Sequence, residues 1–155
     1  EEVFEKPHNL FVAEFIGAPK MNIIRTNLVL ENGKYYVTPL GAKIEVDGLN
    51  SQLLKQNGVT SCEILLGVRP EHMELAPASA ANTIDGSILV NEMMGSELHL
   101  HVKVNDGSKI IARIPTVGLT HEERAQMKNG LPVHLTFPGK VMYFFDPETE
   151  QNLIY

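Results

Sequence analysis

The chain has 155 residues, 43% of them hydrophobic and 21% charged, which is the composition of an ordinary globular protein. Its net charge is −6 and its 13 Lys and Arg residues form no basic run, which argues against a nucleic-acid-binding protein. No apolar stretch approaches the roughly 20 residues of a membrane-spanning helix, so we expect any membrane association to depend on a partner. Cys62 is the only cysteine, which excludes an intrachain disulfide, and its strand-like surroundings predict a buried apolar side chain.

The first segment predicts a helix. Pro7 suits a first helical turn, and apolar residues follow it at helical spacing. Gly17 and then Pro19 mark the end of this helix. The chain begins at Glu1, and we expect it to be a fragment of a longer protein.

Beyond Met21 the pattern changes to short strands separated by turns. Strands are predicted over residues 22–31, 35–37, 43–46, 62–68, 83–94, 98–104, 109–114, 131–137 and 141–145. Asn32-Gly33 and Asp106-Gly107 predict tight hairpin turns. The pattern predicts an all-β fold, and its strand–strand–helix–strand order occurs twice, which favours two small packed barrels.

Two short helices interrupt the strands. One is predicted over residues 49–56, with Asn50 or Ser51 as its N-cap and Gly58 as its end. The other runs from Thr120 toward Lys128 and begins with a capping box, in which Thr120 and Glu123 satisfy each other's backbone N–H groups.

The sequence carries no phosphate-binding loop. Its only Gly-Lys pairs, Gly33-Lys34 and Gly139-Lys140, lack both the following Ser or Thr and the preceding Gly of that motif. We therefore predict no nucleotide, cofactor or catalytic site within this chain. His99 and His101 face the same side of one strand and could begin a metal site, but no third ligand is evident and a solvated polar strand face is the favoured interpretation.

Four segments resemble, in order, the sugar-importer ATPases of the maltose and multiple-sugar type. They are PHNLFVAEFIGAPKMN (residues 7–22), LGVRPEHM (66–73), VNEMMGSE (90–97) and FFDPET (144–149). Three positions depart from the usual pattern of the family, namely Asn91, Met94 and Glu150.

The resemblance implies a C-terminal regulatory domain of the TOBE type, a β-barrel with an oligonucleotide/oligosaccharide-binding (OB) fold, belonging to the ATP-binding subunit of a sugar importer. Residues 1–21 would then be the end of the nucleotide-binding domain and a linker helix, and residues 22–155 the regulatory β-domain. The resemblance places ATP and Mg²⁺ in a missing N-terminal domain. It implies a second copy of the subunit, permease subunits and, in some members, a regulatory protein as partners, at the cytoplasmic face of the membrane.

The motifs also supply candidate regulatory or dimer-contact residues, which are Gly67, Arg69, Pro70, Glu71, His72, Gly95, Glu97 and Asp146. Gly67 would allow a close backbone approach in a core strand, and Arg69 before Pro70 would end that strand. Glu71 would pair with Arg69 or with a neighbour at a subunit surface. A different class of function, a stand-alone β-barrel that binds a small ligand or an oxyanion, is the alternative.

Overall fold

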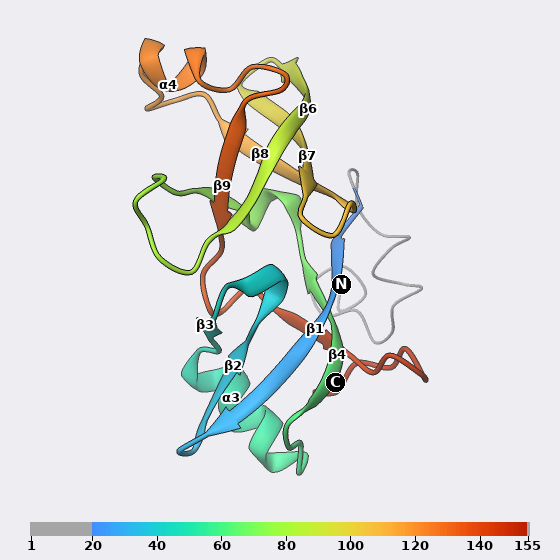
Figure 1. Ribbon diagram of the computed structural model, residues 1–155. Coiled ribbons are helices and arrows are strands. Elements are labelled where there is room, and N and C mark those ends of the chain that lie inside the picture. The colour runs from blue at the N-terminus through green and yellow to red at the C-terminus, as the bar shows by residue number, and fades with distance from the viewer. Residues whose placement is uncertain (1–19, 155) are drawn as a thin grey trace. The chain divides into compact units, whose positions relative to one another are not determined.

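The computed structural model describes residues 20–154 and divides the chain into two compact units (Figure 1). Unit 1 comprises the residues up to Arg69 together with those from Pro138 onward, and unit 2 comprises Pro70–Phe137. Each unit is built on its own five-stranded antiparallel sheet, which confirms the all-β prediction. The predicted N-terminal helix lies outside the described residues.

Unit 1 has the strand order β10-β4-β1-β2-β3. Its elements are β1 (Asn22–Glu31), β2 (Lys34–Val37), the short helix η1 (Pro39–Gly41), β3 (Ile44–Glu45), α3 (Gly48–Gln56), β4 (Cys62–Val68) and β10 (Tyr143–Phe145). The predicted hairpin is confirmed, because Asn32 and Gly33 both have positive φ angles, 50° and 77°, and pair Glu31 with Lys34.

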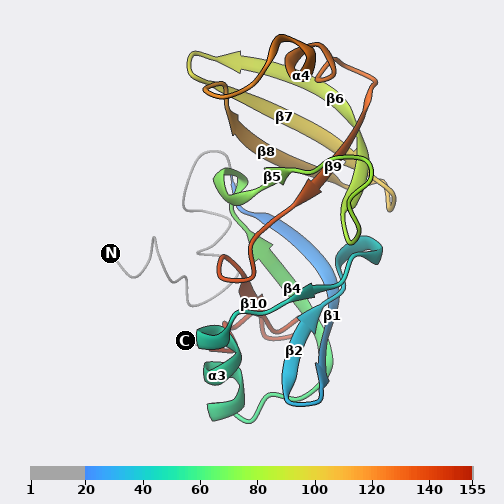
Figure 2. The same ribbon diagram turned by 90° about the vertical axis from the view of Figure 1, so that its left-hand side faces the viewer.

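Helix α3 begins earlier than predicted. Its N-cap is Asp47, whose Oδ1 accepts a hydrogen bond from the Asn50 backbone N–H at 3.2 Å, so the prediction of Asn50 or Ser51 as the cap was wrong. The Asp47 N–H is in turn bound to the Gly139 carbonyl, at 3.1 Å, and this contact sets where the chain enters the helix. Figures 1 and 2 show α3 beside the sheet, and Leu54 is its buried side chain.

Cys62 is exposed, which corrects the prediction of a buried side chain. Strand β10 pairs only with Leu65, Leu66 and Gly67, so the first residues of β4 have a neighbouring strand on one side alone. Partial desolvation and the nearby Asp146 carboxylate raise the pKa of the Cys62 thiol, which is the opposite of what a reactive cysteine needs.

Unit 2 has the strand order β5-β9-β6-β7-β8. Its elements are the short helix η2 (Pro70–His72), β5 (Glu74–Leu75), β6 (Ile84–Met94), β7 (Glu97–Val104), β8 (Lys109–Pro115), α4 (His121–Ala125) and β9 (Pro132–Thr136). Both η2 and β5 also contact β8, so the sheet curls back on itself into a nearly closed barrel (Figure 2).

The alternation of apolar and polar residues along β7 determines which of its side chains point into the barrel. Leu98, Leu100, Val102 and Val104 are buried in the barrel core, and the intervening side chains point outward, as predicted. The predicted capping box of α4 is present, with Thr120 Oγ1 accepting from the Glu123 N–H at 3.0 Å. The helix ends at Ala125, short of Lys128, and buries none of its own side chains. In the described part of the chain, no helix is long and apolar enough to cross a membrane.

Candidate functional site on the outer face of the second sheet

The predicted site residues fall in both units. Unit 1 holds Gly67, Arg69 and Asp146, and unit 2 holds Pro70, Glu71, His72, Gly95 and Glu97. The boundary between the units therefore lies inside the LGVRPEHM motif, between Arg69 and Pro70. This is where β4 ends and η2 begins, as the Arg-Pro pair predicts.

Gly67 is where a side chain would not fit. A Cβ placed on it would lie 2.5 Å from Met21 Sδ, 3.1 Å from Phe145 Cε2 and 3.4 Å from Tyr143 Cβ. Met21 and Phe145 are both buried in one hydrophobic cluster with Leu65, so the predicted close approach in the core is confirmed.

Arg69 and Asp146 make local contacts in unit 1. The Arg69 guanidinium lies over the Tyr143 ring, 5.6 Å from its centre, in a cation–π contact. Asp146 Oδ1 accepts the backbone N–H groups of Thr149 at 2.9 Å and of Glu148 at 2.8 Å. These bonds close the turn after β10 and lower the pKa of the Asp146 carboxyl.

In unit 2 the candidates Glu71 and Glu97 converge on Arg113, a residue of β8. The Arg113 Nε and Nη2 atoms donate to Glu97 at 2.9–3.2 Å in a bidentate pair, and Nη1 lies 3.8 Å from Glu71 Oε1. The partner that the structure gives Glu71 is thus Arg113 of the same chain, and pairing at a subunit surface stays a prediction. Arg113 itself was not predicted as a site residue. Its side chain points outward from β8, and the strand register places it opposite His99, which explains how it reaches the cluster.

The two strand histidines extend this charged cluster. His99 Nε2 lies 3.3 Å from Glu97 Oε1, and His101 Nε2 lies 2.6 Å from Glu92 Oε1. Arg113 first, and then His99, lower the pKa of the Glu97 carboxyl, so this group stays ionised. Among the described residues no three His, Cys, Asp or Glu side chains are grouped as a metal site would need, and the two histidines instead form hydrogen bonds with Glu97 and Glu92 on the strand face.

The remaining unit 2 candidates lie around this face. Gly95 is in the β6–β7 turn, at a φ of 69° that favours glycine. Pro70 is buried in η2. The neighbouring His72 has a buried Nδ1 with no hydrogen-bond partner among the described residues.

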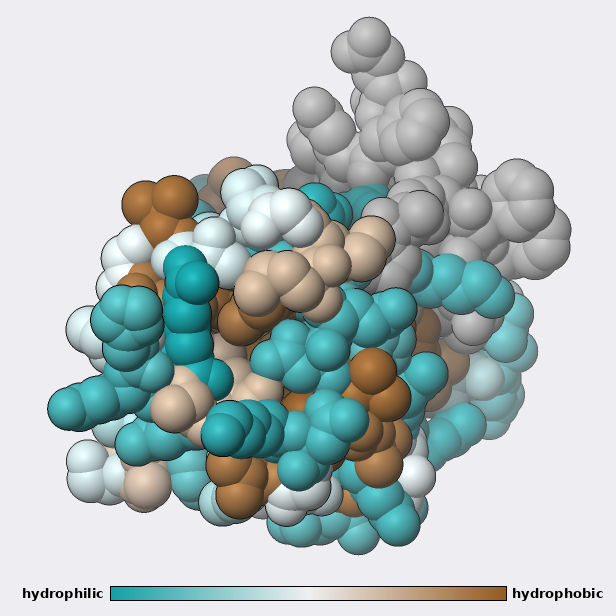
Figure 3. Space-filling view, turned by 90° about the horizontal axis from the view of Figure 1, so that it is seen from above, coloured by the Kyte–Doolittle hydropathy of each residue, from teal (hydrophilic) through white to brown (hydrophobic). Residues whose placement is uncertain are grey.

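Apolar side chains are exposed beside the charged cluster. Val90 and Met94 are 45% and 52% exposed, and the register of β6 places them opposite His101 and Glu97, on the outer face of the sheet. Figure 3, which views the molecule from above, shows exposed apolar side chains in separate patches between hydrophilic ones. We call the outer face formed by Glu71, Val90, Glu92, Met94, Glu97, His99, His101 and Arg113 the β6–β8 face. This face thus carries paired charges beside exposed apolar side chains.

Sequence comparison finds relatives along nearly the whole chain. The multiple sugar-binding transport ATP-binding protein MsmK of Streptococcus mutans is 30% identical over 97% of the chain, and the oligosaccharides import ATP-binding protein MsmX of Bacillus subtilis is 31% identical over 99%. The sn-glycerol-3-phosphate import ATP-binding protein UgpC of Burkholderia cenocepacia is 32% identical over 96%. The chain spans only 38–40% of the length of these relatives.

A solved structure shares the fold. The cytoplasmic molybdate-binding protein ModG superimposes with a TM-score of 0.60, over 85% of this chain and 99% of that protein, at 17% identity. This likeness concerns the fold alone.

Residues 17–73 match the MalK OB fold domain family, and residues 66–145 match the TOBE domain family. The chain therefore belongs to the TOBE domain family, as the four motifs of the sequence imply.

Proposed function

We propose that this chain is the regulatory and dimerisation domain of the ATP-binding subunit of a sugar importer, which in the full protein couples ATP hydrolysis to sugar import. The observation that supports this proposal most strongly is that importer ATP-binding proteins match 96–99% of the chain, whereas the chain spans only 38–40% of their length. In this proposal the chain is not itself an enzyme. ATP and Mg²⁺ bind in the remainder of the full-length protein, and residues 1–21 form the end of that domain and the linker.

The proposed partners follow from the same assignment. The full-length protein would pair with a second copy, meet permease subunits and lie at the cytoplasmic face of the membrane. A regulatory protein is a further partner. The relatives are named for the transport of sugars or of sn-glycerol-3-phosphate, and the four sugar-importer motifs favour a sugar here.

For contact with the second copy we propose the β6–β8 face. A twofold interface brings the same patch of both copies together, so the patch must complement itself. The β6–β8 face carries both signs of charge, with Arg113 between Glu71 and Glu97, and it exposes the apolar side chains of Val90 and Met94. The other candidate residues, Gly67, Arg69, Pro70, His72, Gly95 and Asp146, would then shape and support this domain.

Sedimentation analysis and ATP titration of the 155-residue chain test the proposal. We expect a concentration-dependent dimer and no tight ATP binding. The Met94→Glu variant should weaken the dimer, whereas Leu49→Glu, which changes an even more exposed apolar residue in unit 1, should not. Tight ATP binding by the chain alone would contradict the assignment, and a dimer insensitive to Met94→Glu would contradict the proposed surface.

A further inference from the structure

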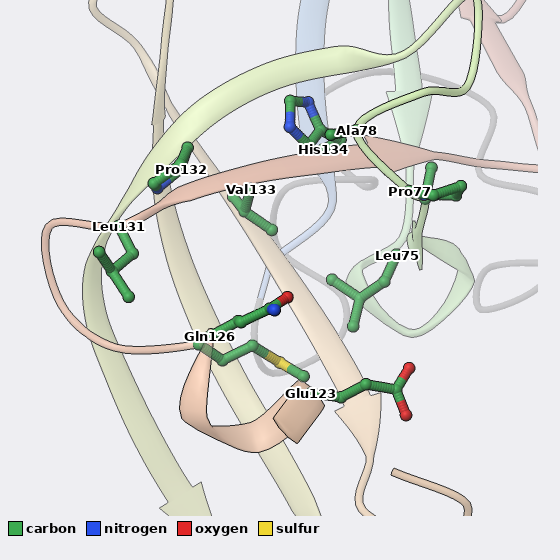
Figure 4. Close-up of a pocket in the computed structure, with 11 residues that line it drawn as sticks. Leu75, Pro77, Ala78, Glu123, Gln126, Leu131, Pro132, Val133 and His134 are labelled. Carbon is green, nitrogen blue, oxygen red and sulfur yellow. The ribbon is translucent and has the colours of Figure 1, made fainter. Parts of the chain in front are cut away.

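Unit 2 contains a pocket that none of the predicted site residues lines. It has a volume of about 580 Å³ and lies between α4 with its following turn on one side and β5 and β9 on the other (Figure 4). Its lining residues are Leu75, Ala76, Pro77, Ala78, Glu123, Gln126, Met127, Leu131, Pro132, Val133 and His134. Sites for small molecules commonly have volumes of roughly 300–1,000 Å³.

The chemistry of the lining narrows the class of ligand. Eight of the eleven lining residues are apolar, and none is Lys, Arg, Phe, Tyr or Trp. An oxyanion such as molybdate or sulfate would find no Lys or Arg side chain in this lining, and the ring of His134 is already bound to Asp85 at 2.7 Å. A sugar would find no aromatic side chain and few hydrogen-bonding groups. The lining instead suits an apolar body.

Besides His134, the polar lining residues are Glu123 of α4 and Gln126 just after it, which supply a carboxylate and an amide. Figure 4 shows the Gln126 amide between the side chains of Val133 and Leu75, and the Glu123 carboxylate at the rim. Glu123 Oε1 accepts the Thr120 backbone N–H at 2.9 Å, which holds this carboxylate in place. A fixed carboxylate and an amide oxygen can each accept a hydrogen bond from a cationic donor.

A ligand in the pocket could add contacts between α4 and the barrel. The helix itself has no buried side chain, and Met127, just after it, is the residue that anchors this segment in the core. A molecule in the pocket would pack against Met127 and against Leu75 and Val133 on the barrel side. Filling the pocket would therefore stabilise the attachment of α4 to the barrel.

We propose that this pocket binds a small amphiphilic amine, with its apolar body against β5 and β9 and its ammonium group at Glu123 and Gln126. This site goes beyond the proposed function and does not depend on it. It would give the domain a way to respond to a small molecule through the position of α4.

A matched pair of probes tests the charge preference. Hexylammonium and hexanoate have similar apolar bodies and opposite charges, and each can be titrated into the ¹⁵N-labelled 155-residue chain. We expect hexylammonium to cause saturable chemical-shift changes at residues 75–78, 121–127 and 131–134, the segments that line or hold the pocket. Hexanoate should bind at least several-fold more weakly. Equal binding of the two probes, or changes confined to other segments, would overturn the proposal, as would no binding at all.

Two pairs of variants locate the site. Glu123→Gln removes the charge but retains the capping box, since Gln also fits that position, and should weaken hexylammonium binding about threefold to tenfold. Glu122→Gln removes a charge from the same helix outside the lining and should leave binding unchanged. Ala76→Leu should fill the pocket and abolish binding, whereas Ala80→Leu, outside the lining, should not. If both members of a pair behave alike, the pocket is not the binding site.

Discussion

The close approach at Gly67 makes a stability prediction that the structure allows to be worked out. Substituting alanine adds a Cβ at 2.5 Å from Met21 Sδ and 3.1 Å from Phe145 Cε2, whereas carbon atoms in comfortable contact are about 3.5–4.0 Å apart. The Met21 side chain is flexible and can move, but it is only 5% exposed, so its displacement disturbs the cluster around it. The Phe145 ring is fully buried and has less freedom.

The expected loss of stability in the Gly67→Ala variant is the difference between two opposing effects. Overpacking a well-filled core costs about 1–3 kcal/mol. Replacing glycine also reduces the conformational entropy of the unfolded chain, which returns about 0.4–1 kcal/mol where the backbone geometry suits alanine. Gly67 has no positive φ, so this second effect operates. The free energy of unfolding of unit 1 should therefore fall by about 1–2 kcal/mol in the Gly67→Ala variant.

The chain offers a probe that reports on unit 1. It has no tryptophan, and its four tyrosines, Tyr35, Tyr36, Tyr143 and Tyr155, all belong to unit 1. Urea denaturation followed by tyrosine fluorescence thus measures unit 1, and amide CD measures both units. The midpoint of the tyrosine transition should fall while its m-value stays unchanged.

Two further variants decide whether the close contact is the cause. Gly48→Ala at the start of α3 meets no atom within 4 Å and should be neutral or stabilising by up to about 1 kcal/mol. In a Met21→Ala background the nearest atom is gone, so Gly67→Ala should cost less there than in the parent chain. A Gly67→Ala variant as stable as the parent, or one whose cost is unaffected by Met21→Ala, would refute this reasoning.

Three other outcomes are expected. Arg113 keeps the pKa of the Glu97 carboxyl low, so their pair stabilises the fold above the unfolded-state pKa of Glu97 and loses this effect as the pH falls through the folded-state pKa. Glu97→Gln should therefore lower the free energy of unfolding near neutral pH and flatten its decline below about pH 4. Urea titrations at several pH values measure both effects. Thr120→Ala removes the N-cap of α4 and should destabilise that helix by about 0.5–2 kcal/mol, measured as faster amide hydrogen exchange in α4 alone. Tyr35→Phe removes the hydrogen bond from the phenol to the Val59 carbonyl. The free energy of unfolding, measured by urea denaturation, should fall by about 0.5–1.5 kcal/mol. An unchanged value would show that water replaces this bond fully.

Much of the candidate site lay beyond prediction because its contacts join distant positions. Glu71 and Glu97 could be singled out from motifs, but their shared partner Arg113 follows only from the pairing of β7 with β8 and from the curling that brings η2 against β8. The N-cap of α3 was misassigned although its contact is local, since Asp47 is a preferred N-cap residue type and accepts the N–H of Asn50, three residues on. Cys62 was misassigned because the length of β10 decides which part of β4 is covered.

The sequence by itself determined the all-β class, nearly every strand, the Asn32-Gly33 hairpin, the capping box at Thr120 and the family. These features depend on side-chain periodicity, turn geometry and motifs, which involve residues near one another in the chain. Only the tertiary structure decided where the two units divide the chain, that Gly67 faces Met21 and Phe145, and that α4 and β9 enclose a pocket. Those features depend on packing between remote segments, which local patterns do not encode.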